Sequence, residues 1–352
     1  MKLRVMPGYA PMEARVVDTL PIGPQWQYEP KWDGFRCLAF RDAASVELMS
    51  KSGQRLTPYF PEVVAALAGL KAKRFVLDGE IVVSARLGLS FDTLLQRIHP
   101  AKTRVERLAA ETPAVLLAFD LLVDLRGNDL TGKPLSERRR RLNAFAGRHF
   151  GDDTGIVLSP ATRRVAEARK WLAGHAGTDG VIAKRLDLPY ATGERTAMVK
   201  IKRKRTCDCV VGGFRYASTG HVVGSLLLGL YDSDGILHHV GFTSSFTSQE
   251  RKCITPIVDE LRGGEGFTGR APGGPSRWST KRSSEWEPLR PQLVVEVGYD
   301  HVTNGRFRHG TRFIRWRPEK APAQCLLSQV AESRAESGPR RASARRSHVI
   351  RR

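Results

Sequence analysis

The sequence lacks any apolar run as long as the roughly 18 to 20 residues that a membrane-spanning helix requires. Its first residues, MKLRVMPGYAPMEARVV, also lack the apolar core of a secretory signal. We therefore expect neither a membrane span nor secretion, and the predicted compartment is the reducing cytosol.

Cysteine is scarce: the chain has five, an odd number, and none of them forms a C-x-x-C pair. Cys207 and Cys209 form C-x-C, and no second pair completes the four ligands of a structural zinc site. Disulfides are rare in a reducing cytosol. We therefore expect both residues to be thiols on a strand, and we expect no zinc site.

Acidic residues are outnumbered, because 57 Lys and Arg stand against 36 Asp and Glu, a formal net charge of +21. Such an excess favours a polyanionic partner, since each neutralised phosphate releases condensed counterions. A basic surface that faces only solvent is the alternative. Anionic lipid would call for a basic amphipathic helix, and the sequence shows none. The charge therefore favours nucleic acid.

The length of 352 residues allows two domains, and the pattern of the chain changes near Arg205. Before Arg205, strand patterns alternate with helical ones. Strands are predicted within 24–50, 74–83, 114–122, 179–185 and 197–204, and helices at 59–70, 91–98, 136–147 and over VAEARKWLA. Ser136 is the expected N-cap of the 136–147 helix. The four arginines of that helix are expected to face solvent.

After Arg205, five short strand patterns surround one helix near 247–262 and a Gly/Pro-rich loop at 263–276. This spacing predicts a small barrel of the oligonucleotide-binding type. From Ala321 the chain is polar and rich in arginine. We expect this tail to be disordered, and it either adds a non-specific grip on DNA or only solvates the chain.

Six short patterns place basic or acidic side chains beside the expected strands. They are EPKWDGFR (29–36), Asp78-Gly79-Glu80, Phe119-Asp120, DGVIAK (179–184), Lys200-Ile201-Lys202 and RFIRWRPEK (312–320). Each alone has an ordinary explanation: a surface turn, core packing or a solvent-facing strand. Carboxylates inside an apolar run are nevertheless costly unless a cation neutralises them. Strand alternation puts Lys200 and Lys202 on one face, where both can meet phosphate oxygens.

Taken together, in this order and spacing, the patterns resemble the nucleotidyltransferase superfamily of ATP-dependent DNA ligases and messenger-RNA capping enzymes. The resemblance covers about residues 25–320, and the chain looks most like the short bacterial ATP-dependent DNA ligases of the actinobacterial type. It implies an α+β fold of two domains. Residues 1–203 would form the adenylation (nucleotidyltransferase) domain, made of antiparallel sheets flanked by helices and ATP-grasp-like. Residues 204–320 would form a small β-barrel OB-fold domain, with a hinge at 203–206 and a basic tail at 321–352.

The resemblance also implies roles for individual residues. Lys31 matches the lysine that attacks the α-phosphate of ATP and carries AMP covalently. Glu29 matches the residue beside adenine, and Phe119 matches the aromatic that stacks on adenine. Arg36 matches the arginine that holds the ribose and later the DNA end.

Metal and phosphate ligands follow in the same way. Glu80 matches the glutamate that binds the ribose and helps the divalent metal, Mg²⁺ or Mn²⁺. Asp179 occupies the place of a metal-binding acid, where many relatives have the longer glutamate. Lys200 and Lys202 match the pair on the α-phosphate. In the barrel, the residues that match those orienting the pyrophosphate are Arg315, Arg317 and Lys320.

One position departs from the family pattern. In SKSGQR, Lys51 stands where the S-R-x-G turn usually carries arginine. Lysine neutralises a phosphate but lacks the bidentate fork of arginine. Arg55 lies nearby, but the motif does not align it.

The implied activity is ATP-dependent sealing of nicked or broken duplex DNA, with contacts mainly to phosphates, by a monomer in repair or end joining. Few residues precede Lys31, so we expect no large DNA-clasping domain there. We expect help from a Ku-type end-binding protein or a repair polymerase, in the nucleoid-associated cytoplasm of a bacterium. The alternatives are an RNA ligase, a GTP-using capping guanylyltransferase, or a non-catalytic DNA-end-binding protein.

Overall fold

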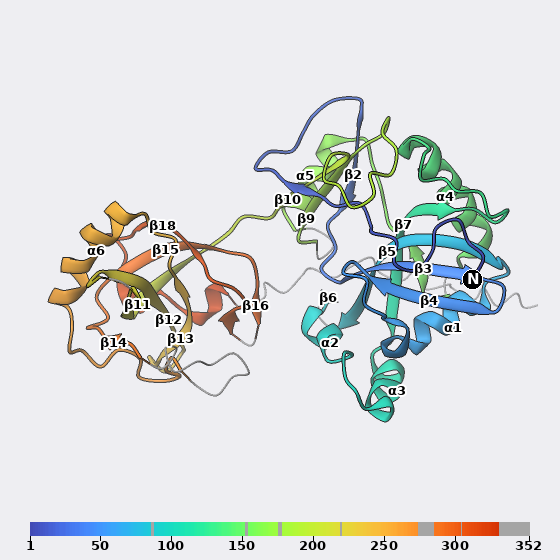
Figure 1. The fold of residues 1–352 in the computed structure, drawn as a ribbon. Coiled ribbons are helices and arrows are strands. Elements are labelled where there is room, and N and C mark those ends of the chain that lie inside the picture. Colours follow the sequence, from blue (N-terminus) through green and yellow to red (C-terminus); the bar gives the residue numbers. More distant parts are fainter. Residues whose placement is uncertain are drawn as a thin grey trace, which may run out of the picture. The chain divides into compact units, whose positions relative to one another are not determined.

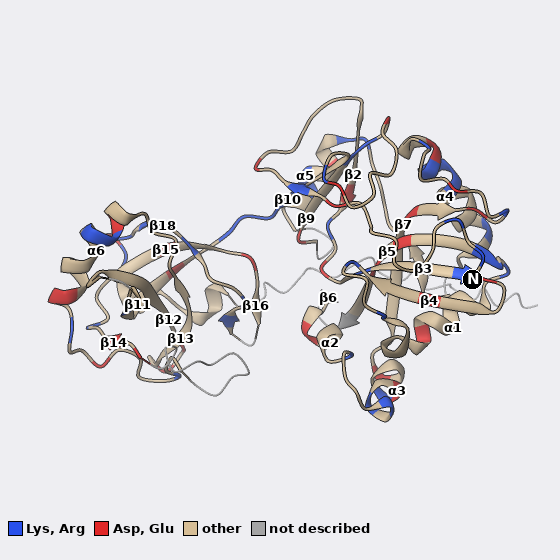
Figure 2. Ribbon diagram, viewed as in Figure 1, with Lys and Arg blue, Asp and Glu red and all other residues tan. Residues whose placement is uncertain are grey.

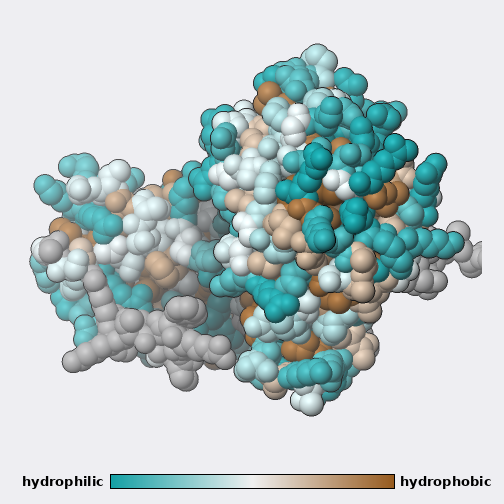
Figure 3. Space-filling model, turned by 45° about the vertical axis from the view of Figure 1, so that its right-hand side comes forward, coloured by the Kyte–Doolittle hydropathy of each residue, from teal (hydrophilic) through white to brown (hydrophobic). Residues whose placement is uncertain are grey.

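The computed structural model describes residues 1–85, 88–151, 154–174, 178–218, 220–273, 285–303 and 305–330. The chain divides into two compact units, and each is described by itself: unit 1 spans Met1–Arg203, and unit 2 begins at Lys204 (Figure 1). Figure 3 shows a face on which hydrophilic residues dominate and hydrophobic patches are small and scattered. Within the described ranges, no helix is both long and apolar enough to cross a bilayer.

The larger sheet of unit 1 has the strand order β4-β3-β5-β7-β8, with β6 beside the end of β5. Its strands are β3 (Phe35–Asp42), β4 (Ser45–Ser50), β5 (Arg74–Ala85), β6 (Gly88–Leu89), β7 (Ala114–Val123) and β8 (Ile156–Leu158). All its neighbours are antiparallel except β7 and β8, which are parallel. The register sets Arg36 opposite Glu80 and Asp78 opposite Asp120.

Both faces of this sheet are buried, which explains the continuous apolar runs in its strands. In β3, Cys37 and Ala39 belong to one core cluster, whereas Leu38 and Phe40 belong to another. Alternate side chains of a strand point to opposite faces, so the two clusters lie on either side of the sheet. Each large apolar side chain buried in this way contributes roughly 1.5–3 kcal/mol.

Short helices pack around the two sheets of unit 1. Those on the side of the larger sheet are η1 (Thr57–Tyr59), α1 (Pro61–Gly69), α2 (Phe91–Leu95), α3 (Lys102–Glu111) and α4 (Leu135–His149), whereas α5 (Val165–Leu172) packs against the four-stranded sheet described below. The pattern of the sequence predicted all of them except η1 and α3. In α3 only Val105 and Leu108 are buried, so its apolar face is too narrow to stand out from the surrounding charges.

A second, four-stranded sheet has the order β1-β10-β9-β2. Its strands are β1 (Arg15–Val16), β2 (Trp26–Pro30), β9 (Gly180–Arg185) and β10 (Met198–Lys202). β9 lies between β2 and β10 and is antiparallel to both. The end of β2 and the end of β10 therefore lie on either side of the start of β9.

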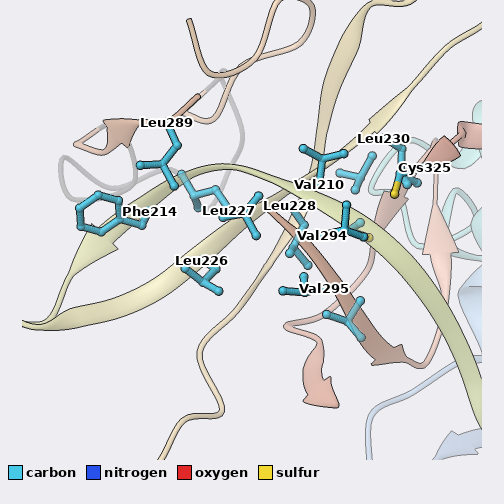
Figure 4. Close-up of a cluster of buried hydrophobic side chains, with 14 of the residues drawn as sticks. Val210, Phe214, Leu226, Leu227, Leu228, Leu230, Leu289, Val294, Val295 and Cys325 are labelled. Atoms are coloured by element: carbon cyan, nitrogen blue, oxygen red, sulfur yellow. The ribbon is translucent and has the colours of Figure 1, made fainter. Parts of the chain in front are cut away.

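Unit 2 is built on five antiparallel strands in the order β13-β12-β11-β15-β18. They are β11 (Arg205–Tyr216), β12 (Val223–Tyr231), β13 (Leu237–Thr243), β15 (Val294–Tyr299) and β18 (Arg312–Trp316), joined by α6 (Ser248–Glu260) and short β14 (Glu287–Pro288), β16 (Val302–Thr303) and β17 (Arg306–Phe307). A bridge between Thr243 and Thr311 joins the two outer strands. Strands far apart in the sequence thus surround one apolar core, which includes Phe214, Leu228 and Val295 (Figure 4).

Two expectations for the 136–147 helix are wrong. Helix α4 begins at Leu135, and its N-cap is Pro134 rather than Ser136. Proline presets a φ that leads into a helix, and its carbonyl accepts the backbone N–H of Arg138 at 3.1 Å. Nor do all four arginines face solvent: Arg138 and Arg139 are buried. Arg138 forms an ion pair with buried Asp120 at 2.9 Å, a partner that no local pattern reveals.

The expected tail is also partly wrong. Residues 321–330 are part of unit 2 and form two short turns, η3 (Pro322–Gln324) and η4 (Leu327–Gln329). Cys325 is fully buried, and its carbonyl accepts the N–H of Tyr231 at 2.8 Å. Sparse apolar residues therefore sufficed to anchor a polar segment. The expected disorder of 331–352 and the 274–276 part of the expected loop lie outside the described residues.

Candidate active site

Lys31 and Asp179 meet where β2 ends and β9 begins. The Lys31 N–H donates to the carbonyl of Gly180 at 3.0 Å, and the Asp179 N–H donates to the carbonyl of Lys31 at 2.9 Å. This reciprocal pairing places the two side chains together, with Lys31 Nζ 2.6 Å from Asp179 Oδ2. Gly180 has a φ of +143°, and a Cβ there would lie 2.1 Å from the Ile201 carbonyl oxygen. The glycine is therefore required for β9 to approach β10 so closely.

The Glu29 carboxylate is buried and ion-paired with Lys184, whose Nζ lies 2.6 Å away. Gln27 donates a second hydrogen bond to Glu29 at 2.8 Å. The Lys184 Nζ also lies 4.3 Å from the centre of the Phe119 ring, and the Arg36 guanidinium lies 4.7 Å from the same centre. Phe119 is thus flanked by two cations, and Glu29 is fixed in place beside it.

Arg36 is held by a buried carboxylate that the sequence reasoning did not assign. Its guanidinium donates to both oxygens of Asp78, each at 2.6 Å. Tyr190 donates its hydroxyl to Asp78 at 2.6 Å. Burial and the neighbouring Asp78 charge hold the pKa of Tyr190 well above its usual value. The phenol therefore stays protonated and keeps donating, which fixes the orientation of the Asp78 and Arg36 pair.

Glu80 lies half-buried on β5, opposite Arg36. Its carboxylate makes no hydrogen bond or ion pair within the described part of the chain. Burial raises the pKa of Glu80 to about 7, although Arg36 and Lys31 oppose the rise and Asp78 adds to it. A Cβ on Gly34 would lie 2.3 Å from the Ile81 carbonyl oxygen and 2.9 Å from Glu80 Cγ. The glycine of KWDG therefore lets the lysine-bearing segment approach Glu80.

Cations gather beside Lys31. Lys200 and Lys202 are the half-exposed positions of β10, as alternation predicts. Burial and then the charges of Lys202, Lys31, Lys51 and Arg195 lower the pKa of Lys200. This concentration of positive charge suits the phosphates of a nucleotide.

Glu13 links two of these cations. Its Oε2 lies 3.2 Å from Lys51 Nζ and 3.0 Å from Arg195 Nε. The N–H of Glu13 donates to the Glu194 carbonyl at 2.8 Å. Sequence reasoning missed both Glu13 and Arg195, because neither belongs to a short pattern and 182 positions separate them. Arg195 supplies a guanidinium next to Lys51, the position where the expected arginine is absent.

The barrel motif lies in unit 2 and is held by two carboxylates of neighbouring strands. Arg317 and Lys320 both bind Asp208 on β11, at 2.9 and 2.7 Å. Arg315 binds Glu296 on β15 at 2.8 Å. Asp208 and Glu296 are direct cross-strand partners. The basic side chains of the motif are thus held over the paired strands β11 and β15.

The predicted residues therefore form two groups. Unit 1 contains one group, and unit 2 contains Arg315, Arg317 and Lys320. The residues in unit 1 are Glu29, Lys31, Arg36, Lys51, Glu80, Phe119, Asp179, Lys200 and Lys202. Lys184 was missed although it follows Asp179 in DGVIAK, because strand alternation alone does not indicate burial on that face.

The carboxylates close to Lys31 decide whether a divalent metal could bind there. Within the described ranges, no group of three or more His, Cys, Asp or Glu could hold a metal by itself. Mg²⁺, however, usually binds through one or two carboxylates together with waters and substrate phosphates. A half-buried Glu80 without a hydrogen bond, close to Lys31 and its partner Asp179, fits that kind of site.

Known proteins resemble this chain over nearly all its length. Residues 11–202 match the ATP dependent DNA ligase domain, and residues 219–320 match the ATP dependent DNA ligase C terminal region. DNA ligase C of Mycobacterium tuberculosis is 43% identical over 346 residues, which cover 94% of this chain and 96% of that protein. The multifunctional non-homologous end joining DNA repair protein LigD of the same species is 30% identical over 307 residues, covering 86% of this chain and 37% of that protein.

A solved structure from a structure–function analysis of Lig E DNA ligases has a TM-score of 0.54 at 16% identity, and the match covers 88% of this chain and 99% of that one. At this identity the match shows the shared fold alone. The predicted α+β fold of an adenylation domain and an OB-fold domain is confirmed.

Proposed function

The chain belongs to the ATP-dependent DNA ligase family, and we propose that Lys31 carries the AMP with which it seals nicks in duplex DNA. The observation that carries the assignment is the contact of Lys31 Nζ with Asp179 Oδ2 at 2.6 Å, inside a cluster of phosphate-binding cations. A nucleophilic amine needs a group that takes its proton and groups that hold the phosphate. Both are present at this lysine.

In the first step the Lys31 amine attacks the α-phosphorus of ATP. A phosphorus–nitrogen bond forms, the bond to pyrophosphate breaks, and Asp179 receives the proton that leaves the amine. Lys200 and Lys202 hold the α-phosphate. Lys51 and Arg195, which Glu13 links to each other, contact further phosphate oxygens. Phosphoryl transfer depends mainly on such positioning and charge stabilisation.

The nucleoside occupies the region around Phe119. Adenine stacks on Phe119, and the Glu29 carboxylate, fixed by Lys184, accepts a hydrogen bond from the adenine amino group. Arg36 and Glu80 contact the ribose. Lys184 and Gln27 hold Glu29, and Asp78 holds Arg36, so little side-chain ordering is required for these residues to contact a nucleotide.

A divalent metal, Mg²⁺ or Mn²⁺, would be held by Glu80 with Asp179. When bound, it would neutralise negative charge that develops on the phosphate oxygens. Asp179 is one carbon shorter than glutamate and already contacts Lys31, so Glu80 would be the main protein ligand.

The second and third steps use the same site. AMP passes from Lys31 to the 5′-phosphate of the nick, so the phosphorus–nitrogen bond breaks and a pyrophosphate linkage forms. The 3′-hydroxyl then attacks the DNA 5′-phosphorus, forms the phosphodiester and releases AMP. In unit 2, Arg315, Arg317 and Lys320 orient the pyrophosphate of the first step, and residues 203–206 serve as the hinge.

The context we propose is DNA repair or end joining by a monomer in the bacterial cytoplasm, at the nucleoid. The similarity to LigD, a non-homologous end joining repair protein, supports that context. A Ku-type end-binding protein or a repair polymerase would assist binding to broken ends. Sealing of blunt or cohesive ends that is no faster with purified Ku would contradict the partner proposal.

The test of the proposed function uses ATP or GTP labelled at the α-phosphate, with magnesium, and a denaturing gel. We expect a labelled protein band from ATP, loss of the band in Lys31→Ala, and transfer of the label when nicked duplex is added. Lys102→Ala, at a lysine whose side chain is 87% exposed on α3, is the matched control and should keep the band. Labelling by GTP alone, or unchanged labelling in Lys31→Ala, would reject the assignment.

A further inference from the structure

The indole of Trp32, the residue directly after Lys31, has a fixed partner that none of the ligation steps above explains. Its Nε1–H donates to the hydroxyl oxygen of Ser159 at 2.9 Å. Trp32 is half-buried, whereas Ser159 is fully buried and directly follows β8. Lys31 follows a strand of the four-stranded sheet, and β8 belongs to the larger sheet. The side chain next to the proposed nucleophile is therefore held by the other sheet of unit 1.

The segment of Lys31 is thus tied to both sheets. The Lys31 backbone pairs with the residues at the start of β9, and the Trp32 side chain bonds to the end of β8. A second connection lies nearby, because Tyr28 on β2 and Thr162 exchange two backbone hydrogen bonds, at 2.8 and 2.9 Å. The chain just after β8 therefore connects the sheet that carries Phe119 to the strand that leads to Lys31.

Ser159 is itself fixed from two directions. Its N–H donates to the carbonyl of Ala118 at 2.8 Å, and Ala118 directly precedes Phe119. From α4, buried Arg139 donates to the Ser159 carbonyl at 2.6 Å. Figure 2 shows basic segments of α4 in blue. Ser159 is therefore a rigid anchor next to the ring on which adenine is proposed to stack.

We propose that Trp32 is a positioning residue, which through Ser159 holds the Lys31 amine in line with the α-phosphorus of ATP. The inference rests on the proposed function, because it takes Lys31 as the nucleophile and Phe119 as the ring that stacks on adenine. Stacking on Phe119 places the nucleotide against the larger sheet, whereas the amine comes from the other sheet. In-line attack depends on the alignment of the two, and the bond between Trp32 and Ser159 sets that alignment.

A hydrogen bond that only stabilised the fold would give a different result. Its loss would make the protein easier to unfold and would leave the reaction of the folded protein unchanged. A bond that positions the amine acts on the maximal rate of lysyl-AMP formation. The KM for ATP should stay the same, because the side chains that bind the nucleotide are untouched. The division of the effect between the rate and KM therefore separates the two roles.

The experiment measures single-turnover formation of lysyl-AMP by the full chain, from ATP labelled at the α-phosphate, with magnesium, over a range of ATP concentrations. Trp32→Phe keeps an aromatic ring and removes the N–H, and Ser159→Ala removes the accepting oxygen. Each is expected to lower the maximal rate constant about tenfold and to change the KM for ATP less than about twofold. The double variant should be no slower than either single variant, because both substitutions remove the same bond.

Trp171→Phe is the matched control. Trp171 packs against the apolar cluster of the four-stranded sheet, and its indole makes no hydrogen bond within the described part of the chain. The substitution should therefore leave the rate constant unchanged. Ser159→Ala deletes a single oxygen, so the test stays valid even if Trp32→Phe unfolds.

Three results would overturn the proposal. Unchanged rate constants in both single variants would show that the bond does not position the amine. An additive loss in the double variant would show that the two side chains act separately. A raised KM for ATP with an unchanged maximal rate would assign the pair to nucleotide binding. Failure of the wild-type chain to form lysyl-AMP would instead reject the proposed function, whereas normal labelling of wild type and of all variants would reject the positioning role alone.

Discussion

Replacing Glu80 by glutamine should stabilise the protein while it removes activity. Burial raises the pKa of Glu80 from 4.5 to about 7. Below pH 4.5 the group is neutral in both the folded and the unfolded state, so it costs nothing. As the pH rises from 4.5 to 7, the unfolded chain loses the proton first, and stability falls until the folded-state carboxyl has ionised. A shift of one unit corresponds to about 1.4 kcal/mol, so the cost at pH 8 is up to roughly 3 kcal/mol.

Glutamine keeps the shape of the side chain and removes the charge. Glu80→Gln should therefore raise the free energy of unfolding by up to roughly 3 kcal/mol at pH 8, but by well under 1 kcal/mol at pH 4. Urea unfolding of the full chain followed by tryptophan fluorescence measures both values. The chain has two units, and Glu80 lies in unit 1. The free energy to compare is therefore that of the unfolding transition whose midpoint the Glu80→Gln substitution shifts. Sealing activity should fall because the proposed metal loses its main carboxylate.

Glu47→Gln is the matched control of opposite sign. Glu47 lies on β4 of the same sheet, and its hydrogen bond with Arg55 lowers its pKa. Its ionised form therefore stabilises the folded chain above pH 4.5, and that stability is lost as the pH falls through the lowered value. Glu47→Gln should destabilise the protein at pH 8. A Glu80→Gln variant that is no more stable than wild type at pH 8, or equally stabilised at pH 4, would refute the reasoning.

Three further predictions concern residues around the nucleotide. Asp179→Asn should slow lysyl-AMP formation about a hundredfold, because the amide cannot take the proton of the amine; quenched-flow labelling with ATP measures the rate, and an unchanged rate would contradict the role. Arg195→Ala should lower sealing about tenfold, and Lys51→Arg in that background should restore it; no restoration would show that the two positions are not equivalent. Tyr190→Phe should destabilise the chain by about 2 kcal/mol through the lost hydrogen bond to Asp78, and a loss below 0.5 kcal/mol in urea unfolding would contradict it.

The grouping of Lys51 with Arg195 illustrates what a motif leaves undecided. The SKSG turn gives lysine where the family pattern has arginine, and no neighbour in the sequence replaces the missing guanidinium. In the structure, Glu13 brings Arg195 to that place from a loop before β10. Arg55, the nearer candidate in the sequence, instead pairs with Glu47. Proximity in the chain was therefore a poor guide to proximity in space.

The sequence by itself determined the features that depend on local geometry. Alternation along β10 put Lys200 and Lys202 on one face. The continuous apolar runs predicted β5 and β7 as strands. Both predictions follow from the pattern of a few adjacent residues.

Only the tertiary structure decided which charges are paired and buried. Arg138 belongs to a run of arginines typical of a solvated helix, yet it is fully buried with Asp120. Glu80 and Asp78 lie two positions apart, yet Asp78 is neutralised by Arg36 while Glu80 is left without a hydrogen bond in the described ranges. The free energy of a buried charge depends on what distant strands place beside it, and that information is spread over the whole chain.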